Sequence, residues 1–507
     1  MTDSDNIRDR LKKPLQRPSA LPVKHASAKP EPAADVPANQ PGALARLLDG
    51  LAKMLAPKPA PAEQPQAKPA EPPVFTVLVA AMSGDGADGA ASQALFKLLE
   101  SCVTLKVKPL PKVFQLDTLE DPGQVAATMA AVRMAVASEN ADLLVWGDVA
   151  KDGYRLRLST AAADDERLGG FGPSTRVELP LALAEPQLHL LHAACLAAGE
   201  ASTEIQRAGL RRVLPLAVGP LEPLAAKPSV QMTMPQQRTA QMVYGHVCAA
   251  VAQVVPPSQA DSWLQKAVDA YRAAEKRLAR HDPAWETGLV RRHIAAVLTQ
   301  RAERAKEKAQ AYLQEAVTEW RAAAEALPKG TMPQEWAAVQ TRLGVALYRL
   351  DLLTGDTDLL REAVQALQGA LSVYGRNETP QRWADIMHNL AQVLEVYGDQ
   401  LKSTEVLGRA IDACEAVMEI RTRERTPLSW AATQNTLGSA LFLLDRLGGN
   451  GRHLDGAIAA FQGALDVFTA HGRKGPAQVA ARNLAKARKA AEDRKGRQVI
   501  NPHWADD

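Results

Sequence analysis

Few residues in this 507-residue chain have types and spacings that could support chemistry. The clearest is the loop Ser83–Gly89, with the sequence SGDGADG. It follows an apolar run and opens a helical pattern, a position where backbone N–H groups can bind a phosphate. The loop has neither the Gly-Lys-Ser/Thr of a P-loop nor the spacing of a dinucleotide fingerprint, and its two aspartates repel an anion. We therefore expect a tight strand-to-helix turn, with a nucleotide site as the alternative.

A second candidate is a metal site at His189, His192 and Cys195, which follow one another in steps of three residues along a predicted helix. Each step turns a helix by about 300°, so Cys195 leaves the line of His189, and no fourth ligand is apparent. We expect these residues to pack in a half-buried helix. The chain has no G-x-S-x-G, H-E-x-x-H or paired-carboxylate motif, so we expect no enzyme, catalytic residue, metal or cofactor.

The strongest pattern is a repeat in the second half of the chain. Trp336, Trp383 and Trp430 are 47 residues apart, and each follows a proline by three residues. Thr379 and Thr426 precede two of these prolines, where a capping hydroxyl and a proline at the first helical position start a helix. We expect each tryptophan to face inward and clamp onto the preceding unit. A fixed period of this length indicates a helical solenoid, a class that binds partners rather than catalysing reactions.

A second template recurs in the other helix of each pair: a small residue, a large one four positions on, and a small one three further. Its members are Ala267, Tyr271, Ala274; Ala316, Trp320, Ala323; Ala363, Leu367, Ala370; Ala410, Cys414, Val417; and Ala457, Phe461, Ala464. The first helices carry Leu343-Gly344, Leu390-Ala391 and Leu437-Gly438. Small residues on one helical stripe let two backbones approach closely. We therefore predict about five helix pairs followed by a capping helix.

Both templates resemble those of the tetratricopeptide repeats (TPR), whose first helix carries Leu-Gly-x-x-large and whose second carries Ala-x3-aromatic-x2-Ala. The resemblance extends from about Gln236 to the C-terminus and is strongest from Pro333 to Phe468. The family period is about 34 residues rather than 47, so HEAT or armadillo stacking is the structural alternative. The resemblance implies that the partner is another protein, bound as a peptide or a helix in a concave groove.

The resemblance also implies which residues face that groove, namely those two positions before and two after the leucine of each Leu-Gly pair. Carried over to this chain, they are Thr341, Val345, His388, Gln392, Asn435 and Ser439. His388 is the one titrating group among them; we expect it to form hydrogen bonds, with pH-dependent binding as the alternative. The set does not match the Lys/Asn/Arg pattern that binds a terminal carboxylate, so a chaperone-tail ligand is not expected.

Between Pro73 and Pro223, apolar runs alternate with helical patterns, which predicts a small α/β domain. The predicted strands are 74–80, 103–110, 141–149, 154–160 and 175–179, and the predicted helices are 89–102, 123–138 and 185–208. The stretch ADLLVWGDV at 141–149, followed by GYRLRL at 153–158, is similar to the amino-terminal domain of the TolB translocation protein. Domains of that group often precede tetratricopeptide repeats in bacterial regulatory proteins. This resemblance implies a non-catalytic interaction domain.

Residues 1–72 form a Pro/Ala-rich tract that we expect to be disordered, because it holds too few large apolar groups to offset chain entropy. Within it, leucines at helical spacing over Gly42–Ala56 predict an amphipathic helix that docks on a partner, on a membrane surface or on the protein's own groove. A weakly helical segment is the alternative. The sequence shows no signal peptide and no membrane-spanning run, which favours a cytoplasmic protein, with peripheral membrane association as the alternative.

We expect the solenoid to occupy 224–495 and a short tail to follow at 496–507. Its last helix, from Pro476 to about Asp493, is basic; a terminal repeat must present a polar face to water, which accounts for this charge without a ligand. Because interleaved aromatic residues are absent there and the net charge is only +3, we do not expect nucleic acid as a partner. The four separated cysteines are expected to be buried free thiols.

The expected fold class is therefore α+β and multidomain: a disordered tail, a small α/β domain and an all-α TPR-like solenoid. The function best supported by the sequence is a non-enzymatic scaffold or adaptor. The alternative is a sensor of a small ligand or nucleotide, in which the Ser83–Gly89 loop holds the ligand and the repeats relay the signal.

Overall fold

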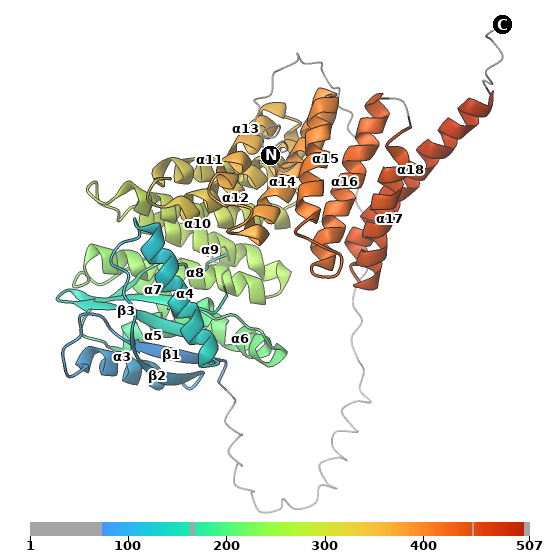
Figure 1. The fold of residues 1–507 in the computed structure, drawn as a ribbon. Helices are drawn as coiled ribbons and strands as arrows, with labels where there is room; N and C mark the ends of the chain where they lie inside the picture. Colours follow the sequence, from blue (N-terminus) through green and yellow to red (C-terminus); the bar gives the residue numbers. More distant parts are fainter. Residues whose placement is uncertain (1–72, 163–167, 449–450, 501–507) are drawn as a thin grey trace, which may run out of the picture. The chain divides into compact units, whose positions relative to one another are not determined.

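The computed structural model describes residues 73–162, 168–448 and 451–500, with side chains to residue 494. The predicted tail at 1–72, including its helix at 42–56, and the residues after 500 lie outside this part. A small mixed sheet comes first, and helices follow it to the end of the described chain (Figure 1). No helix among the described residues is long and apolar enough to cross a membrane.

The sheet has five strands in the order β2-β1-β3-β4-β5. Its strands are β1 (Phe75–Ala81), β2 (Leu105–Val113), β3 (Leu143–Ala150), β4 (Gly153–Ser159) and β5 (Val177–Leu179). β2, β1 and β3 are parallel to one another. β4 is antiparallel to β3, and β5 is antiparallel to β4. α3 (Ala90–Glu100) connects β1 to β2, and α4 (Pro122–Ser138) connects β2 back past β1 to β3. The right-handed connections usual between parallel strands place two such helices on opposite faces of a sheet. The five predicted strands are confirmed to within a few residues.

The predicted helix at 185–208 is wrong, because the structure has two helices there, α5 (Glu185–Ala198) and α6 (Glu204–Ala217). The chain leaves the helical path at Gly199, which lies against the ring of Phe75. A Cβ atom at Gly199 would be only 2.5 Å from that ring. A residue larger than glycine would therefore not fit here against a strand far away in the sequence.

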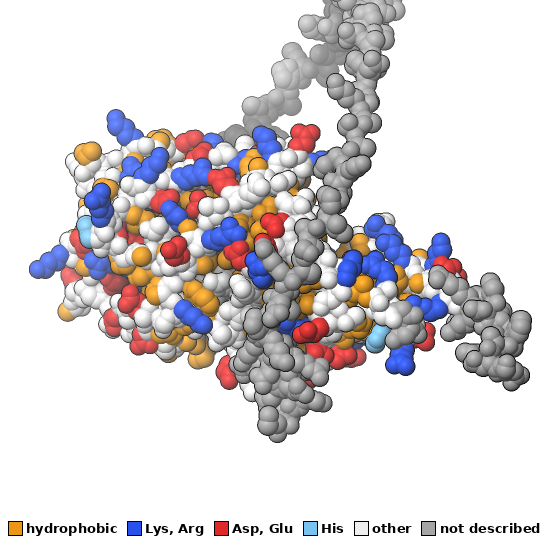
Figure 2. All heavy atoms as spheres, turned by 90° about the horizontal axis from the view of Figure 1, so that it is seen from above, with side chains coloured by type: hydrophobic (Ala, Val, Ile, Leu, Met, Phe, Trp, Pro, Cys, Tyr) orange, Lys and Arg blue, Asp and Glu red, His pale blue; other side chains and the backbone are white. Residues whose placement is uncertain are grey.

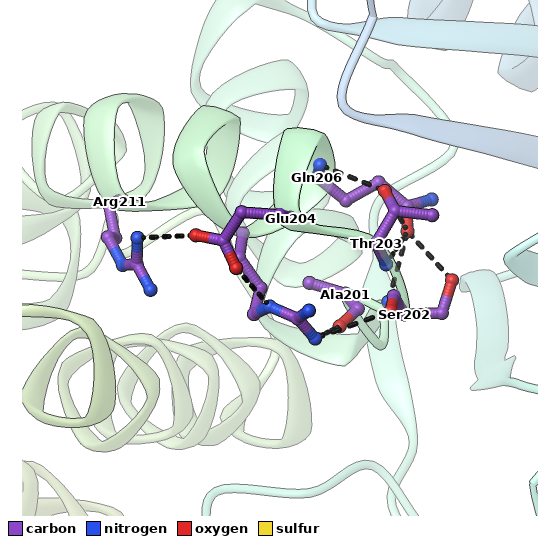
Figure 3. A network of polar contacts seen from close by, with 7 residues as sticks. Ala201, Ser202, Thr203, Glu204, Gln206 and Arg211 are labelled. Atoms are coloured by element: carbon purple, nitrogen blue, oxygen red, sulfur yellow. Dashed lines mark hydrogen bonds and ion pairs between the residues drawn. The ribbon is translucent and has the colours of Figure 1, made fainter.

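A polar network then starts α6 (Figure 3). The hydroxyl of Thr203 accepts a hydrogen bond from the N–H of Gln206 at 3.2 Å, and the side-chain oxygen of Gln206 accepts one from the N–H of Thr203 at 3.1 Å. This reciprocal capping box satisfies two of the free N–H groups at a helix start. Glu204 pairs with Arg207 and Arg211 on the same helix. The second helix is therefore specified locally once the chain has turned.

After α7 (Leu221–Ala226), the chain forms five antiparallel helix pairs and a final helix, as predicted. The pairs are α8 (Met234–Val254) with α9 (Pro257–Glu275), α10 (Ala284–Arg304) with α11 (Ala309–Ala326), α12 (Pro333–Thr354) with α13 (Thr357–Leu371), α14 (Pro380–Leu401) with α15 (Thr404–Met418), and α16 (Pro427–Gly448) with α17 (Leu454–Ala470). The final helix, α18, spans Lys474–Ile500.

The small and large template residues meet inside each pair, as the sequence predicted. A Cβ atom on Gly344 of α12 would lie 2.7 Å from Leu367 of α13, and one on Gly438 of α16 would lie 2.8 Å from Phe461 of α17. Each glycine precedes its large partner by 23 residues. The same spacing joins Ala391 to Cys414 in α14 and α15, where both residues are buried. In this middle pair, Cys414 is smaller than the Leu or Phe of the other pairs, and Ala391 is larger than their Gly. We infer that these two differences compensate each other in volume.

The tryptophans pack differently from the prediction. The rings of Trp336 and Trp430 lie against Gly369 of α13 and Gly463 of α17, in the second helix of their own pairs. The expected clamp onto the preceding unit is therefore wrong in this contact. A cation from the loop before each helix lies over the ring instead: Lys329, Arg376 and Arg423 approach Trp336, Trp383 and Trp430 at 4.8, 5.4 and 5.7 Å.

The two threonines before the prolines also do not cap their helices as expected. The hydroxyl of Thr379 donates to the carbonyl of Gly375 at 3.1 Å and makes no capping bond. The hydroxyl of Thr426 is buried without a partner among the described residues. The backbone at Thr379 has ψ 62° rather than the extended value of a usual N-cap, so its hydroxyl turns away from the first N–H groups.

One contiguous apolar core runs from the sheet through the repeats to α17, and smaller clusters complete the packing of α16 to α18. All four cysteines are buried free thiols, as predicted.

Candidate functional site

The candidate surface is the first-helix face, the side of the repeats formed by α8, α10, α12, α14, α16 and α18. From α10 onward, successive first helices lie closer together than successive second helices. Successive first helices therefore pack directly against one another along this face. Ion pairs join neighbouring first helices there: Glu303 with Arg349, Asp399 with Arg446, and Asp445 with Arg494.

All six residues that the resemblance assigned to the groove are half-buried on the first helices. Several bridge neighbouring helices. The ring of His388 on α14 lies 3.4 Å from the hydroxyl of Thr433 on α16, and Asn435 on α16 accepts a hydrogen bond from Asn483 on α18 at 3.3 Å. Ser439 on α16 hydrogen-bonds to Glu395 on α14. These three positions thus join neighbouring first helices.

The other three residues lie on α12 and α14. Thr341 donates its hydroxyl hydrogen to the backbone carbonyl of Ala337 at 2.8 Å, so its polar group is satisfied within its own helix. Val345 lines a cavity between α10 and α12. Gln392 is half-buried on α14, one turn beyond His388. Val396 lies one helical turn after Gln392 on the same side of α14, and Phe442 lies one turn after Ser439 on the same side of α16. Both side chains are half-buried.

The histidine does not titrate near neutral pH. Burial, assisted by the positive charge of Arg421, lowers the pKa of His388 to about 4. The imidazole is therefore neutral at physiological pH, and hydrogen bonding is the role that its surroundings support.

Part of the first-helix face is already occupied by this chain. The irregular segment 168–176, which connects β4 to β5, crosses the first helices of the first three pairs. Gly169 lies so close to α8 that a Cβ atom would be 2.7 Å from the carbonyl oxygen of His246. Farther along, the rings of Phe171 and His246 are 4.7 Å apart, and Ser174 donates to Glu335 of α12 at 2.8 Å.

The segment 168–176 also closes one side of the cavity beside Val345. This cavity has a volume of about 180 Å³ and is lined by Leu168, by Trp320 of α11 and by residues of α10 and α12. Two of its three arginines pair with acids, Arg292 with Glu335 and Arg349 with Glu303. Sequence reasoning missed these residues, because nothing in the repeat pattern shows that a loop of the α/β domain crosses them.

The phosphate-binding alternative at the Ser83–Gly89 loop meets a direct obstacle. The carboxylate of Asp85 accepts hydrogen bonds from the N–H groups of Gly86, Ala91 and Ser92 and from the Ser92 hydroxyl, at 2.6 to 3.1 Å. Partial burial raises the pKa of Asp85, but these hydrogen bonds outweigh it and lower that pKa overall. The start of α3 is thus filled by the chain's own anion, and the segment is the tight turn that we expected.

The residues considered for a metal site have other contacts. The ring of His192 lies 2.6 Å from the hydroxyl of Thr104, and burial, with the nearby His189, lowers the pKa of His192. His189 lies 3.5 Å from Glu185, and Cys195 is fully buried. No group of three metal-ligating side chains forms a site within the part of the chain that the structure describes.

The basic side chains of the last helix are partly paired. Arg494 of α18 contacts Asp445 of α16, and Arg488 donates to Gln462 of α17 at 3.0 Å. Figure 2 shows Lys and Arg side chains gathered over the end of the molecule formed by the last repeats. These pairs agree with a helix that caps the stack with a polar outer face.

Comparison with known proteins does not name a family. No protein-family model matches the chain, and its sequence matches no curated protein. A solved structure that is similar is described as a circular tandem repeat protein with novel repeat topology and enhanced subunit contact surfaces. It is 14% identical, with 62% of this chain and 84% of that chain covered, and the TM-score is 0.26. The fold itself defines the class as a helical-repeat solenoid joined to a small α/β domain.

Proposed function

We propose that the protein is a non-enzymatic scaffold or adaptor that binds another protein on the first-helix face between α14 and α18. The observation that supports this most is the position of the segment 168–176. An irregular stretch of this chain already lies on α8, α10 and α12, which indicates that the face accommodates an extended polypeptide. Farther along, α14 and α16 have only other repeat helices as substantial packing neighbours among the described elements.

The side chains on α14 and α16 suit a peptide or helical partner. Gln392, Asn435 and Ser439 offer amide and hydroxyl groups, while Val396 and Phe442 add apolar points on the same stripes. Apolar anchors flanked by hydrogen-bonding groups are the usual means of holding a segment in a groove. We also propose that the pairs are TPR-like and that the sheet domain is TolB-like, because the Gly344–Leu367 contact joins residues of the two repeat templates and the stretches 141–149 and 153–158 form the β3–β4 hairpin.

The test compares two full-length variants that gain the same side chain. Gln392→Arg places a charge on the first-helix face, whereas Gln314→Arg places one at an exposed position of α11, a second helix. We expect affinity capture followed by mass spectrometry to recover at least about tenfold less partner with Gln392→Arg, since a buried unpaired charge costs more than about 1.4 kcal/mol. The Gln314→Arg control should bind as the unmodified chain does. Equal recovery with both variants would contradict binding on this face.

A further inference from the structure

A cavity opens at the carboxyl ends of β1 and β3, away from the first-helix face. The chain runs from β1 to one side of the sheet and from β2 to the other, so the strand order reverses here, a position that favours ligand binding in open α/β sheets. The cavity has a volume of about 360 Å³. Two of its lining residues are glycines: a Cβ atom on Gly84 would lie 2.5 Å from the carbonyl oxygen of Val149, and one on Gly147 would lie 2.1 Å from that of Arg155.

Strand register places three arginines beside this cavity on one face of the sheet. Arg155 is opposite Asp148, and Arg157 is opposite Trp146. On the next strand, Val177 pairs with Leu156. Because β4 and β5 are antiparallel, Arg176, just before Val177, lies opposite Arg157, just after Leu156. All three arginines line the cavity.

Their charges are compensated unequally. Arg155 pairs with Asp148 at 3.3 Å and with Asp152 at 3.1 Å. Arg157 is only 4% exposed, and its Nε donates to the carbonyl of Pro173 at 3.0 Å. Among the described residues, no ion pair joins a carboxylate to Arg157 or Arg176. Asp148 and Glu178 act on Arg157 at longer range, and Glu178, which is opposite Arg155 on the same face, also acts on Arg176.

Adjacent like charges on paired strands are unfavourable, and buried charges are normally paired. The guanidinium of Arg157 lies over the ring of Trp146 at 5.3 Å, which supplies only a weak compensation. Burial and the charge of Arg176 lower the pKa of Arg157 to about 10. The burial of Arg157 and its closeness to Arg176 indicate that a negative group belongs beside these two arginines.

We propose that this cavity binds the phosphate group of a small molecule, with Arg157 and Arg176 on its oxygens. Each guanidinium presents parallel N–H groups that match two oxygens of one phosphate, and a phosphate dianion balances two adjacent positive charges. The volume leaves room for a small organic group next to the phosphate. The cavity is lined by Ser83 and Gly84 of the Ser83–Gly89 loop but not by the N-terminus of α3, which Asp85 occupies. The proposal does not depend on the scaffold function.

The test uses thermal melting and calorimetry of the full chain with inorganic phosphate and pyrophosphate. Chloride and acetate at equal ionic strength serve as controls. Phosphate and pyrophosphate should raise the melting temperature, because a ligand that binds only the folded state stabilises it. Arg176→Gln should weaken binding at least about tenfold, the loss expected for one charge-assisted contact. Lys151→Gln, which removes an exposed charge in the turn between β3 and β4, should bind phosphate as the unmodified chain does.

A second readout separates a ligand site from a structural arginine. Without phosphate, Arg176→Gln should melt at the same temperature or higher, because it removes a repulsion from Arg157. A lower melting temperature of this variant would overturn the proposal, since it would show that Arg176 pairs with an acid of the chain. Glu178, which lies two residues after Arg176 and acts on it electrostatically, would then be the acid to consider. Unchanged melting of the unmodified chain with phosphate, equal effects of acetate and phosphate, or unaltered affinity of Arg176→Gln would also overturn it.

Discussion

Close packing between the two helices of a pair can be tested with one substitution made at two glycines. Gly344 of α12 faces Leu367, which is fully buried, and a Cβ atom there would lie 2.7 Å from that side chain and 3.2 Å from the carbonyl oxygen of Ala363. Gly408 of α15, in the next pair, has no atom within 4 Å of the corresponding position. Gly344→Ala must therefore displace the side chain of Leu367 or the backbone of α13, whereas Gly408→Ala fills open space.

The magnitudes follow from two opposing terms. Adding a methyl group to a well-packed core costs about 1 to 3 kcal/mol. Alanine is more favourable than glycine in a helix interior by about 1 kcal/mol. Gly344→Ala should therefore lower the free energy of unfolding by about 1 kcal/mol, and Gly408→Ala should raise it by up to about 1 kcal/mol.

Urea unfolding followed by far-UV circular dichroism measures both variants against the unmodified chain. The midpoints should move in opposite directions at an unchanged slope. If both midpoints rise by a similar amount, helix propensity dominates at both sites, and the close approach of α12 and α13 is refuted.

Two further predictions concern buried groups. Burial, opposed by a hydrogen bond from Ser439, raises the pKa of half-buried Glu395 from 4.5 to about 8. Between these pH values the carboxyl ionises in the unfolded chain but stays protonated in the folded one, so the folded state loses stability progressively as the pH rises. Glu395→Gln should therefore raise the free energy of unfolding by about 2 to 4 kcal/mol at pH 7.5 and by less than about 1 kcal/mol near pH 5; an equal gain at both pH values in chemical denaturation would contradict this sign. Cys414→Phe alone should destabilise by about 2 kcal/mol, and adding Ala391→Gly should recover at least about 1 kcal/mol, because the pair then matches Gly438 and Phe461. A double-mutant cycle with no coupling would show that Ala391 and Cys414 do not face each other.

Local periodicity was sufficient to predict most of the elements. The small and large residues of the repeats, such as Gly344 and Leu367, recur at fixed spacing because each pair must bury the same stripe. The alternating and apolar runs of the sheet likewise predicted five strands. Both patterns reflect the geometry of a single element, which is set by neighbours in the sequence.

Contacts between distant segments were decided only by the tertiary structure. The need for glycine at position 199 depends on the ring of Phe75, and the cover over α8 to α12 depends on where the segment 168–176 lies. Arg157 and Arg176 become neighbours through strand register, and His388 loses its titration near neutral pH through burial. Burial, strand pairing and charge compensation depend on the side chains that lie across from a residue, and the spacing along one chain does not contain that information.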